Sequence, residues 1–312
     1  MHPSLQKNER SKHWLGKLTK LRPAVGRGNM RGPAPHKPLL LFCLLDMAER
    51  GELINKAFTR TPGLVLRFRT YSTLFSDRWP TKLDMRLPFY HLRSQGFWQA
   101  FAADLRPAVS PENCALCELD AEFHDLLADA DFRLKARLVL ISHYFEPIER
   151  VAFFETLGIE TGFAGQGAAD QVREAALEAE KRKGRSAKFQ VRIVDDYRHT
   201  CALTGYRCFT MDGASIVDAA HIDGWAETKN EDLSNGLALS KSAHWMFDEG
   251  LWSVNDDLRV VVHPTRFTEA GPEAFQLRFY AGRHLQFDPT TALRPAADSL
   301  RRHRLRHIGV ML

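Results

Sequence analysis

The sequence lacks any apolar run long enough to cross a bilayer. Its longest such run, Pro38 to Met47, is interrupted by Asp46 and is shorter than the ~20 residues that a membrane helix needs. The first twenty residues are polar and basic, without the apolar core of a secretory signal. Five cysteines are an odd number for a disulfide framework in a chain of 312 residues. These absences predict a cytoplasmic protein with reduced thiols and no membrane partner.

Two signatures of small-molecule enzymes are missing as well. The sequence contains neither a glycine-rich phosphate loop nor a nucleophile elbow, which leaves that class with little support. A structural zinc is not expected, because Cys114 and Cys117 form one CxxC pair without a second pair in range. Cys201 is followed by Thr204-Gly205 where a second cysteine would have to stand.

Charge is present in excess of one sign and is unevenly distributed. The chain carries 43 Lys and Arg against 38 Asp and Glu, a net charge of +5. Residues 1–50 hold ten basic and three acidic residues, a local sum of +7, and Arg301 to His307 form a second basic cluster. Such clusters can be solvated faces, but two of them in one chain favour a polyanionic partner such as double-stranded DNA.

The N-terminal half predicts a mixed α/β domain. Residues 1–33 favour an arm or short helix followed by a loop, and Pro38 and Gly51 mark the start and end of a buried helix. The stretch Leu87–Trp98 is typical of a β-hairpin with a glycine turn, and Glu118–Phe145 has helical periodicity.

The domain boundary is expected in a Gly- and Ala-rich stretch, residues 158–169. A strong helix over Gln171–Lys183 follows and is expected to end at Gly184. The fold class is therefore α+β, with a mixed α/β domain before a second, smaller α+β domain. The predicted bounds are 1–160 for the first domain, 161–187 for a helical linker and 188–312 for the second domain.

The residues with the clearest chemistry lie in the second domain. A strand over Ser215–Ile222 carries His221 near its end, and a polar loop then leads to Asn235 and a second short strand. The helix that follows carries His244 and Asp248, four residues apart. Side chains at this spacing lie on one helix face, about 5–6 Å apart, and can chelate one divalent ion.

His221, Asn235 and His244, in the segments DAAHI, SNGLAL and HWMFDEGL, resemble the HNH or ββα-metal nucleases. The nearest subgroup is the HNH domain of modification-dependent restriction endonucleases. A neutral histidine suits the general base of phosphodiester hydrolysis, because its ordinary pKa lies near working pH. The resemblance implies that Asn235 braces the loop and orients His221. It further implies that His244 and Asp248 hold one Mg²⁺ or Mn²⁺.

The segment departs from the family at Ala220, where many HNH sites place another metal ligand. Asp218 could supply that ligand only if the strand carries a bulge, because strand side chains alternate between faces. The missing carboxylate leaves open an alternative, a DNA-binding protein with an inactive HNH fold.

Two N-terminal segments, RGPAPHKPLLL and LPFYHLRSQGFW, resemble the sulfur-binding domain of phosphorothioate-dependent restriction endonucleases. The resemblance implies that Leu87, Pro88 and His91 form an apolar pocket for the sulfur atom. It places His36 and Lys37 against the flanking backbone and bases.

This family often has an aromatic residue at the position of Leu87 and a small residue at that of His91. These two departures leave the exact substrate open. The resemblance predicts a phosphorothioate mark, and a methylated or hydroxymethylated base is the alternative. Taken together, the sequence predicts a type IV restriction endonuclease. Because one single-metal site cuts one strand, a homodimer is expected.

Overall fold

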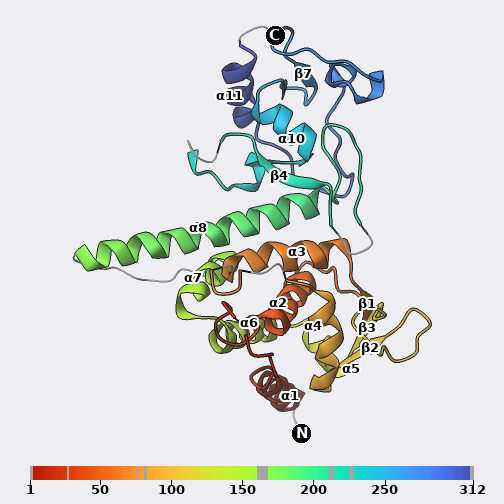
Figure 1. The fold of residues 1–312 in the computed structure, drawn as a ribbon, viewed down its shortest axis with the longest axis vertical. Helices are drawn as coiled ribbons and strands as arrows, with labels where there is room; N and C mark the ends of the chain where they lie inside the picture. The colour runs from red at the N-terminus through yellow and green to blue at the C-terminus, as the bar shows by residue number, and fades with distance from the viewer. Residues whose placement is uncertain are drawn as a thin grey trace. The chain divides into compact units, whose positions relative to one another are not determined.

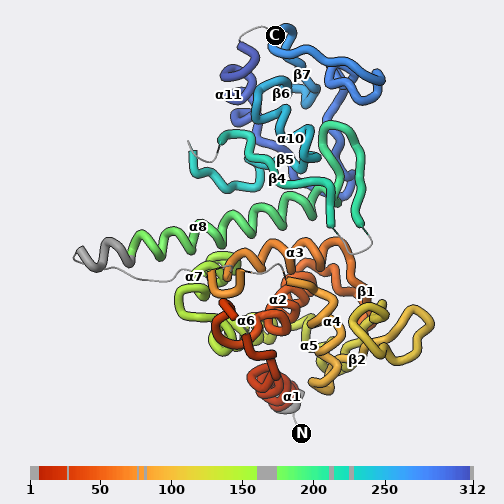
Figure 2. Tube along the Cα trace, in the orientation of Figure 1, coloured from red at the N-terminus to blue at the C-terminus, as the bar shows by residue number. Residues whose placement is uncertain are grey.

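The computed structural model describes residues 3–26, 28–75, 77–80, 83–159, 168–210, 214–224 and 228–309. The chain divides into two compact units, Met1–Gly184 and Arg185–Leu312 (Figures 1 and 2). Both contain helices and small antiparallel sheets, which confirms the α+β class. Among the described residues, no helix combines the length and apolar character needed to cross a membrane.

The first unit is built around α2 (His36–Glu49), whose residues Pro38–Leu45 are all buried. A helix that is apolar on every side belongs in the centre of a core, and α2 packs against three other helices. Gly51, in the left-handed region at φ +70°, follows its end, which confirms the predicted helix. The other helices of the unit are α1 (Pro3–Leu18), α3 (Pro62–Ser72), α4 (Arg86–His91), α5 (Ala121–Leu126), α6 (Ala130–Tyr144) and α7 (Pro147–Thr156).

The sheet of this unit has three antiparallel strands in the order β1-β3-β2. They are β1 (Ala57–Thr59), β2 (Trp98–Phe101) and β3 (Leu116–Leu119). The stretch Glu118–Phe145, predicted as helical, thus begins with the last two residues of β3 and then forms two helices, α5 and α6. Two aspartates set the real starts, because Asp120 caps α5 and Asp129 caps α6 through their side chains.

The predicted hairpin over Leu87–Trp98 is wrong. These residues form α4 and the 3₁₀ helix η2 (Leu92–Gln95), and only Trp98 enters a strand. Asp84 accepts a hydrogen bond from the Arg86 backbone N–H at 2.9 Å, and Pro88 falls in the first helical turn, where its missing N–H needs no partner. Gly96, at φ +77°, ends the helical stretch rather than turning a hairpin.

Helix α8 (Ala168–Asp196) continues through Gly184 instead of ending there. A Cβ at Gly184 would collide with the carbonyl of Ala152 in α7, so the glycine permits close helix packing rather than a stop. Most of the predicted Gly- and Ala-rich boundary, residues 160–167, lies outside the described part of the chain.

The second unit contains the predicted strand–strand–helix arrangement. Strands β4 (Val217–His221) and β5 (Gly236–Ser240) pair antiparallel, and α10 (Lys241–Asp248) packs on both. A second pair, β6 (Trp252–Val254) and β7 (Val260–Val262), follows, and α11 (Ala297–His307) packs against β6. The short 3₁₀ helices are η1 (Thr73–Phe75), η3 (Leu233–Asn235), η4 (Glu273–Phe275) and η5 (Leu277–Tyr280).

Candidate functional site

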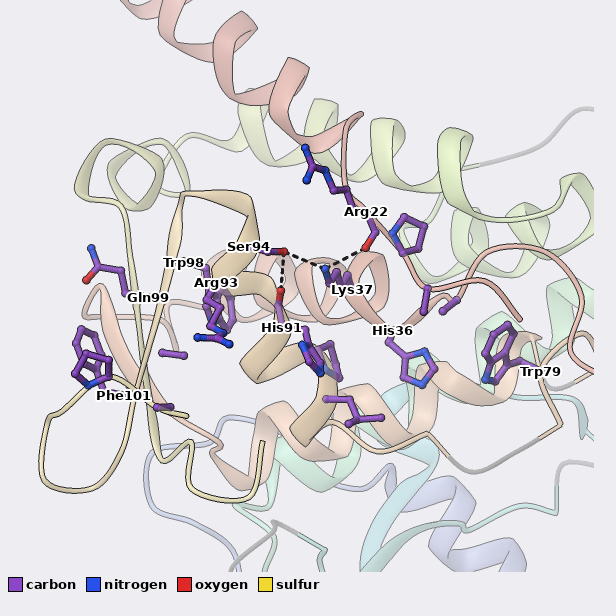
Figure 3. Close-up of a pocket in the computed structure, with 18 residues that line it drawn as sticks. Arg22, His36, Lys37, Trp79, His91, Arg93, Ser94, Trp98, Gln99 and Phe101 are labelled. Atoms are coloured by element: carbon purple, nitrogen blue, oxygen red, sulfur yellow. Dashed lines mark hydrogen bonds between the residues drawn. The ribbon is translucent and has the colours of Figure 1, made fainter. Parts of the chain in front are cut away.

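The first unit contains a cavity of about 910 Å³ beside the N-terminal end of α2 (Figure 3). His36 and Trp79 lie at one end in this view, Gln99 and Phe101 lie at the other, and Lys37 lies between them. Its walls come from five places in the sequence: residues 22–24, the start of α2 with Ala34 before it, the loop that carries Trp79, the α4–η2 segment, and β2 with its following loop. The lining residues are Arg22, Pro23, Ala24, Ala34, His36, Lys37, Trp79, Leu87, Pro88, His91, Arg93, Ser94, Trp98, Gln99, Ala100, Phe101, Pro107 and Ala108.

All five residues proposed for DNA and sulfur binding line this cavity. His36 and Lys37 are the first two residues of α2, while Leu87, Pro88 and His91 come from α4. Helical geometry explains the second group, because residues 87, 88 and 91 fall within one turn of each other. Two segments that are about 50 residues apart in the sequence therefore meet at one surface.

The lining carries positive charge and no acidic residue. Arg22, Lys37 and Arg93 supply the cations, and no Asp or Glu is among the lining residues. The Lys37 ammonium donates to the Arg22 carbonyl at 3.0 Å and to Ser94 Oγ at 3.4 Å. Burial, with the nearby Arg22 charge, lowers the pKa of Lys37, which marks this cation as partly stripped of water. An anionic ligand would relieve that cost.

The two cavity histidines are neutral at physiological pH. Burial lowers the pKa of His36 to about 4, against the upward pull of Asp84, and its ring meets Trp79 edge to face at 5.7 Å. Burial also lowers the pKa of His91, with help from Lys37 and Arg93. Both imidazoles are therefore hydrogen-bonding groups with an apolar body, and they add no fixed charge.

Several lining residues were not predicted from the sequence. Arg93 lies inside the LPFYHLRSQGFW segment, two residues after His91, so its nearness in sequence is a signal for a place in the cavity. Arg22 has no sequence signal beyond its being one of the ten basic residues in 1–50. Trp79 and Phe101 carry no sequence signal, because tertiary contacts bring their segments to the cavity.

In the second unit His221 occupies the last position of β4. Its ring stacks on Phe189 of α8, with centroids 4.1 Å apart and planes 5° from parallel. Burial and the neighbouring His244 lower its pKa, so the imidazole is neutral and able to accept a proton. Its Nε2 is buried and has no hydrogen-bond partner among the described residues. Buried polar atoms nearly always have partners, so an orphan nitrogen here marks a ligand- or water-binding position.

Asn235 is fully buried and fastens the loop that follows His221. Its Oδ1 accepts from the Asp223 backbone N–H at 2.8 Å. Its Nδ2 donates to the carbonyls of Asp223 and Asn230 at 3.2 and 2.9 Å. The amide thus ties the backbone of Asp223 to that of Asn230, rather than bonding the imidazole among the described residues. It is a positioning residue.

His244 and Asp248 lie together on α10, as their spacing predicts. His244 Nε2 is 3.4 Å from Asp248 Oδ2, and both side chains reach the surface. Burial raises the pKa of Asp248, partly offset by His244. Ser240 begins the helix by accepting from the Ala243 N–H, so the cap of α10 fixes where this pair stands.

Asp218 does not join this group. The β4–β5 register runs from Val217 opposite Ser240 to His221 opposite Gly236 without an extra residue. The bulge that a ligand role requires is therefore absent, and strand alternation puts Asp218 on the face opposite His221. Its carboxylate instead binds the Lys241 ammonium at 2.5 Å.

The C-terminal basic cluster is engaged within its own unit. Arg302 of α11 forms a forked pair with Asp223, its guanidinium nitrogens 2.5–3.2 Å from the carboxylate oxygens. Asp223 is only 1% exposed. Burial alone would raise its pKa, but the hydrogen bonds from Arg302 and Ser299 outweigh burial and lower it. Because Asp223 is also tied to Asn235, α11 supports the loop behind His221.

Helix α11 also contacts α10, the helix that carries His244 and Asp248. The ring of His303 stacks on Phe247 at 3.8 Å, and its Nδ1 lies 2.9 Å from Ser253 Oγ. From its composition alone, the cluster Arg301 to His307 predicts only positive charge for a polyanion. Partners such as Asp223, far away in the sequence, give it a structural role that composition cannot reveal.

His244 and Asp248 together suit a divalent cation that keeps most of its coordination positions for water and substrate. Within the described ranges, no group of three or more His, Cys, Asp and Glu lies close enough to hold a metal. HNH nucleases use a divalent metal, and Mg²⁺ is commonly held by one or two protein ligands together with water and substrate phosphate. His244 with Asp248 fits that pattern, and His244 is near enough to His221 to lower its pKa.

Three solved structures are similar to parts of this chain. The modification-dependent TagI restriction endonuclease is 24% identical, with TM-score 0.33, over 41% of this chain and 40% of that one. The sulfur-binding domain of SprMcrA complexed with phosphorothioated DNA is 18% identical, with TM-score 0.34, over 45% and 91%. The type IV phosphorothioation-dependent restriction endonuclease ScoMcrA is 10% identical, with TM-score 0.30, over 75% and 94%. This chain thus spans less than half of the TagI chain.

Two protein families match separate parts of the sequence. Residues 11–162 match the ScoMcrA-like DNA sulfur-binding domain, and residues 201–255 match the HNH endonuclease family. No curated protein matches the chain. The first match contains the whole cavity lining, and the second contains His221, Asn235, His244 and Asp248. The chain therefore carries a ScoMcrA-like DNA sulfur-binding domain over residues 11–162 and an HNH endonuclease domain over residues 201–255.

Proposed function

We propose that this chain is a type IV restriction endonuclease that binds phosphorothioate-marked double-stranded DNA and hydrolyses its backbone. One observation carries the proposal: the cavity of the sulfur-binding domain combines an apolar wall with three cations and no acidic residue. That combination suits an anionic backbone group with one poorly hydrated atom. The sequence-predicted residues all contribute to it.

The discrimination follows from the difference between sulfur and oxygen. A non-bridging sulfur is larger, softer and less hydrated than the oxygen it replaces, so moving it onto an apolar surface costs less. Leu87 and the buried Pro88 offer such a surface on α4. Lys37 and Arg22 balance the negative charge that the modified phosphate retains, and neutral His36 contacts the adjoining backbone or base.

The cutting step uses the neutral imidazole of His221. The histidine takes a proton from water as the water oxygen bonds to phosphorus, and the bond from phosphorus to the 3′-oxygen breaks. That oxygen leaves with a proton from solvent. Asn235 holds the loop next to the base, and the Phe189 ring fixes the plane of the imidazole. General-base catalysis by a positioned histidine contributes about 10²–10⁴-fold in rate.

His244 and Asp248 are the residues that would hold a Mg²⁺ or Mn²⁺ ion. When bound, the ion supplies positive charge against the negative charge that builds on the phosphate and the leaving oxygen. The two residues leave most of the coordination shell to water and to DNA. Asp218 has no part in this site, because the strand bulge is missing and its carboxylate binds Lys241.

The proposed organisation has three parts and two copies. Residues 1–160 read the mark, residues 161–187 form a helical linker and residues 188–312 cut, in the cytoplasm. Because each single-metal site cuts one strand, a break in both strands requires a homodimer. Sedimentation or light scattering of the DNA complex should give two chains per duplex, and a complex of one chain that cuts both strands would contradict this.

A methylated or hydroxymethylated base is the second candidate mark. The cavity of about 910 Å³ exceeds what one sulfur atom occupies and lies in the size range of small-molecule pockets. Trp79 and Trp98 line it and could pack against a base. Duplexes that carry either modified base in place of sulfur test this candidate directly.

Binding at one fixed salt concentration is the test of the sulfur proposal. Basic proteins bind any DNA at low salt, so two duplexes that differ in one sulfur atom should be compared near physiological ionic strength. We expect the sulfur duplex to bind at least tenfold more tightly. Equal affinity would overturn the sulfur mark while leaving the nuclease domain in place.

Plasmid nicking during a metal titration separates an active nuclease from an inactive HNH fold. We expect nicking of sulfur-containing plasmid in Mn²⁺ and none after chelation. DNA binding without nicking at any metal concentration would favour the DNA-binding alternative.

A further inference from the structure

Trp245 is a large aromatic side chain left on the surface of the catalytic helix. It is 61% exposed, and no described residue makes a ring contact or hydrogen bond with its indole. Its neighbour in the same unit, Trp252, is fully buried and donates from its indole N–H to the Ala243 carbonyl at 3.1 Å. Trp252 therefore packs in the core of the unit, whereas Trp245 contributes little to that core.

Trp245 belongs to the face of α10 that carries the proposed metal pair. At about 100° per residue, His244, Asp248, Lys241 and Trp245 fall in one stripe about 100° wide. The buried residues of the helix, Ala243 and Phe247, fall on the other side. The indole thus stands next to Asp248 on the surface that must face the DNA.

We propose that Trp245 packs against the base step beside the scissile phosphate and holds that phosphate over His244 and Asp248. This inference rests on the proposed function, because it concerns DNA at the HNH site. A phosphate that reaches the metal pair brings its flanking sugars and bases over the same helix face. Apolar side chains that enter the minor groove partly unstack a base step, and aromatic rings stack on any base. Trp245 is therefore a positioning residue for cleavage, separate from the reading of the mark.

Charge does not explain the position of the indole, because Lys241, one helical turn before Trp245, is paired with Asp218 and the neighbouring Asp248 is acidic. The residue needs no specific base, because stacking is tolerant of sequence. Trp245 should consequently affect the rate of cutting and the structure of the DNA at the cut, with little effect on discrimination of sulfur.

The test uses the full-length chain and a phosphorothioate duplex whose cut position is first mapped with the wild type. Trp245→Ala should slow single-turnover cleavage in Mn²⁺ at least tenfold, while Trp245→Phe should slow it about threefold. Affinity for the uncut duplex should change less than threefold, because the N-terminal unit supplies most of it. Phe275→Ala is the matched control: Phe275 is an 86% exposed aromatic residue in the same unit, and its loss should change neither quantity.

A fluorescent base distinguishes a DNA contact from an effect on folding. With 2-aminopurine at the cut step and a His221→Ala background that binds without cutting, complex formation should change the fluorescence, because unstacking of the step raises it and stacking of the indole on the probe quenches it. Adding Trp245→Ala should abolish this change, and adding Phe275→Ala should keep it. Unchanged cleavage and fluorescence in Trp245→Ala would overturn this inference alone. If the mass of the assembly in solution falls by half in Trp245→Ala, the residue belongs to a dimer contact, and that result would overturn this inference as well. A wild type that cuts no DNA would overturn both this inference and the proposed function.

Discussion

The two units solve different problems with opposite kinds of site. The N-terminal unit presents a cavity of about 910 Å³ with an apolar wall, three cations and no acidic lining residue. The C-terminal unit presents a few polar side chains at the surface, including an acid, with an orphan nitrogen beside them. Recognition requires a shaped surface that already fits its ligand, whereas phosphodiester hydrolysis requires a few groups at fixed positions and room for substrate.

The supports behind the two sites differ in the same way. Around the cavity, the positions are set by α2 and α4, which pack on each other in the core. Around the catalytic groups, polar ties hold the loop behind His221: Asn235 grips its backbone, and the Asp223–Arg302 pair connects it to α11. Damage to the first site should therefore change affinity, and damage to the second should change rate.

The largest expected effect separates rate from affinity. His221→Ala removes the general base and should lower the single-turnover rate by about 10³-fold. Binding of the sulfur duplex should stay within twofold of wild type, because the cavity is in the other unit. Cleavage that persists at the wild-type rate would show that another group takes the proton.

The second effect is the reverse. Leu87→Glu places a carboxylate in a cavity without acids, facing an anionic ligand, and should weaken binding of the sulfur duplex about 100-fold. Leu87 is 40% exposed, so folding should tolerate the change. Leu134→Glu on α6, at 43% exposure, is the matched control and should bind normally. An equal loss of affinity in both variants would show that the cavity does not bind the sulfur duplex.

A third change tests the polar support of the catalytic loop. Arg302→Ala leaves the buried Asp223 carboxylate without its guanidinium partner and should lower the free energy of unfolding, because an unpaired buried carboxylate is costly. We expect kcat to fall about tenfold with KM unchanged, and Arg302→Lys to restore part of it. Arg301→Ala removes only exposed pairs with Asp256 and Asp298 and should cost under about 0.5 kcal/mol. A similar fall in kcat for Arg302→Ala and Arg301→Ala would show that the Arg302–Asp223 pair does not support the catalytic loop.

The smallest effect is a pH dependence confined to the second unit. Burial lowers the pKa of His303 to about 3, well below its ordinary value of 6.5, so the folded state prefers the neutral ring. Stability from this source is complete above pH 6.5. As the pH falls toward 3, the unfolded chain takes up a proton that the folded chain refuses, and stability declines.

Urea unfolding at several pH values measures this slope. Between pH 6 and pH 5, His303 should account for about 1.2 kcal/mol of lost stability. His303→Gln should be less stable at pH 7 but should lose less on acidification. A wild-type slope that the substitution leaves unchanged would show that His303 is not its source.

The sequence was sufficient where chemistry and local spacing coincide. The strand–strand–helix arrangement around His221 and His244 follows from short-range apolar patterns and a serine cap, and the structure confirms it. Spacing also brought His244 and Asp248 onto one face. The predicted cavity residues meet because the helices that carry them, α2 and α4, pack together. The family resemblance placed these residues in one site, whereas sequence periodicity says nothing about which helices pack together.

Local patterns misled where tertiary contacts decide. Leu87–Trp98 alternates like a hairpin, but Asp84, Pro88 and Gly96 set a helix with a defined end. Gly184 stands where a helix stop is common, but its role is close approach to α7. The use of Arg302 depends on an aspartate 79 positions earlier in the chain, and no window of sequence contains both.

One measurement tests most directly whether the cavity controls the cut. A sulfur duplex and an oxygen duplex of the same sequence, with different dyes, are mixed in one tube with the wild-type chain and Mn²⁺ at physiological salt. The account predicts that only the sulfur-labelled dye appears in cleaved fragments, and that Leu87→Glu removes this product. Equal cutting of both duplexes by the wild type would contradict the account.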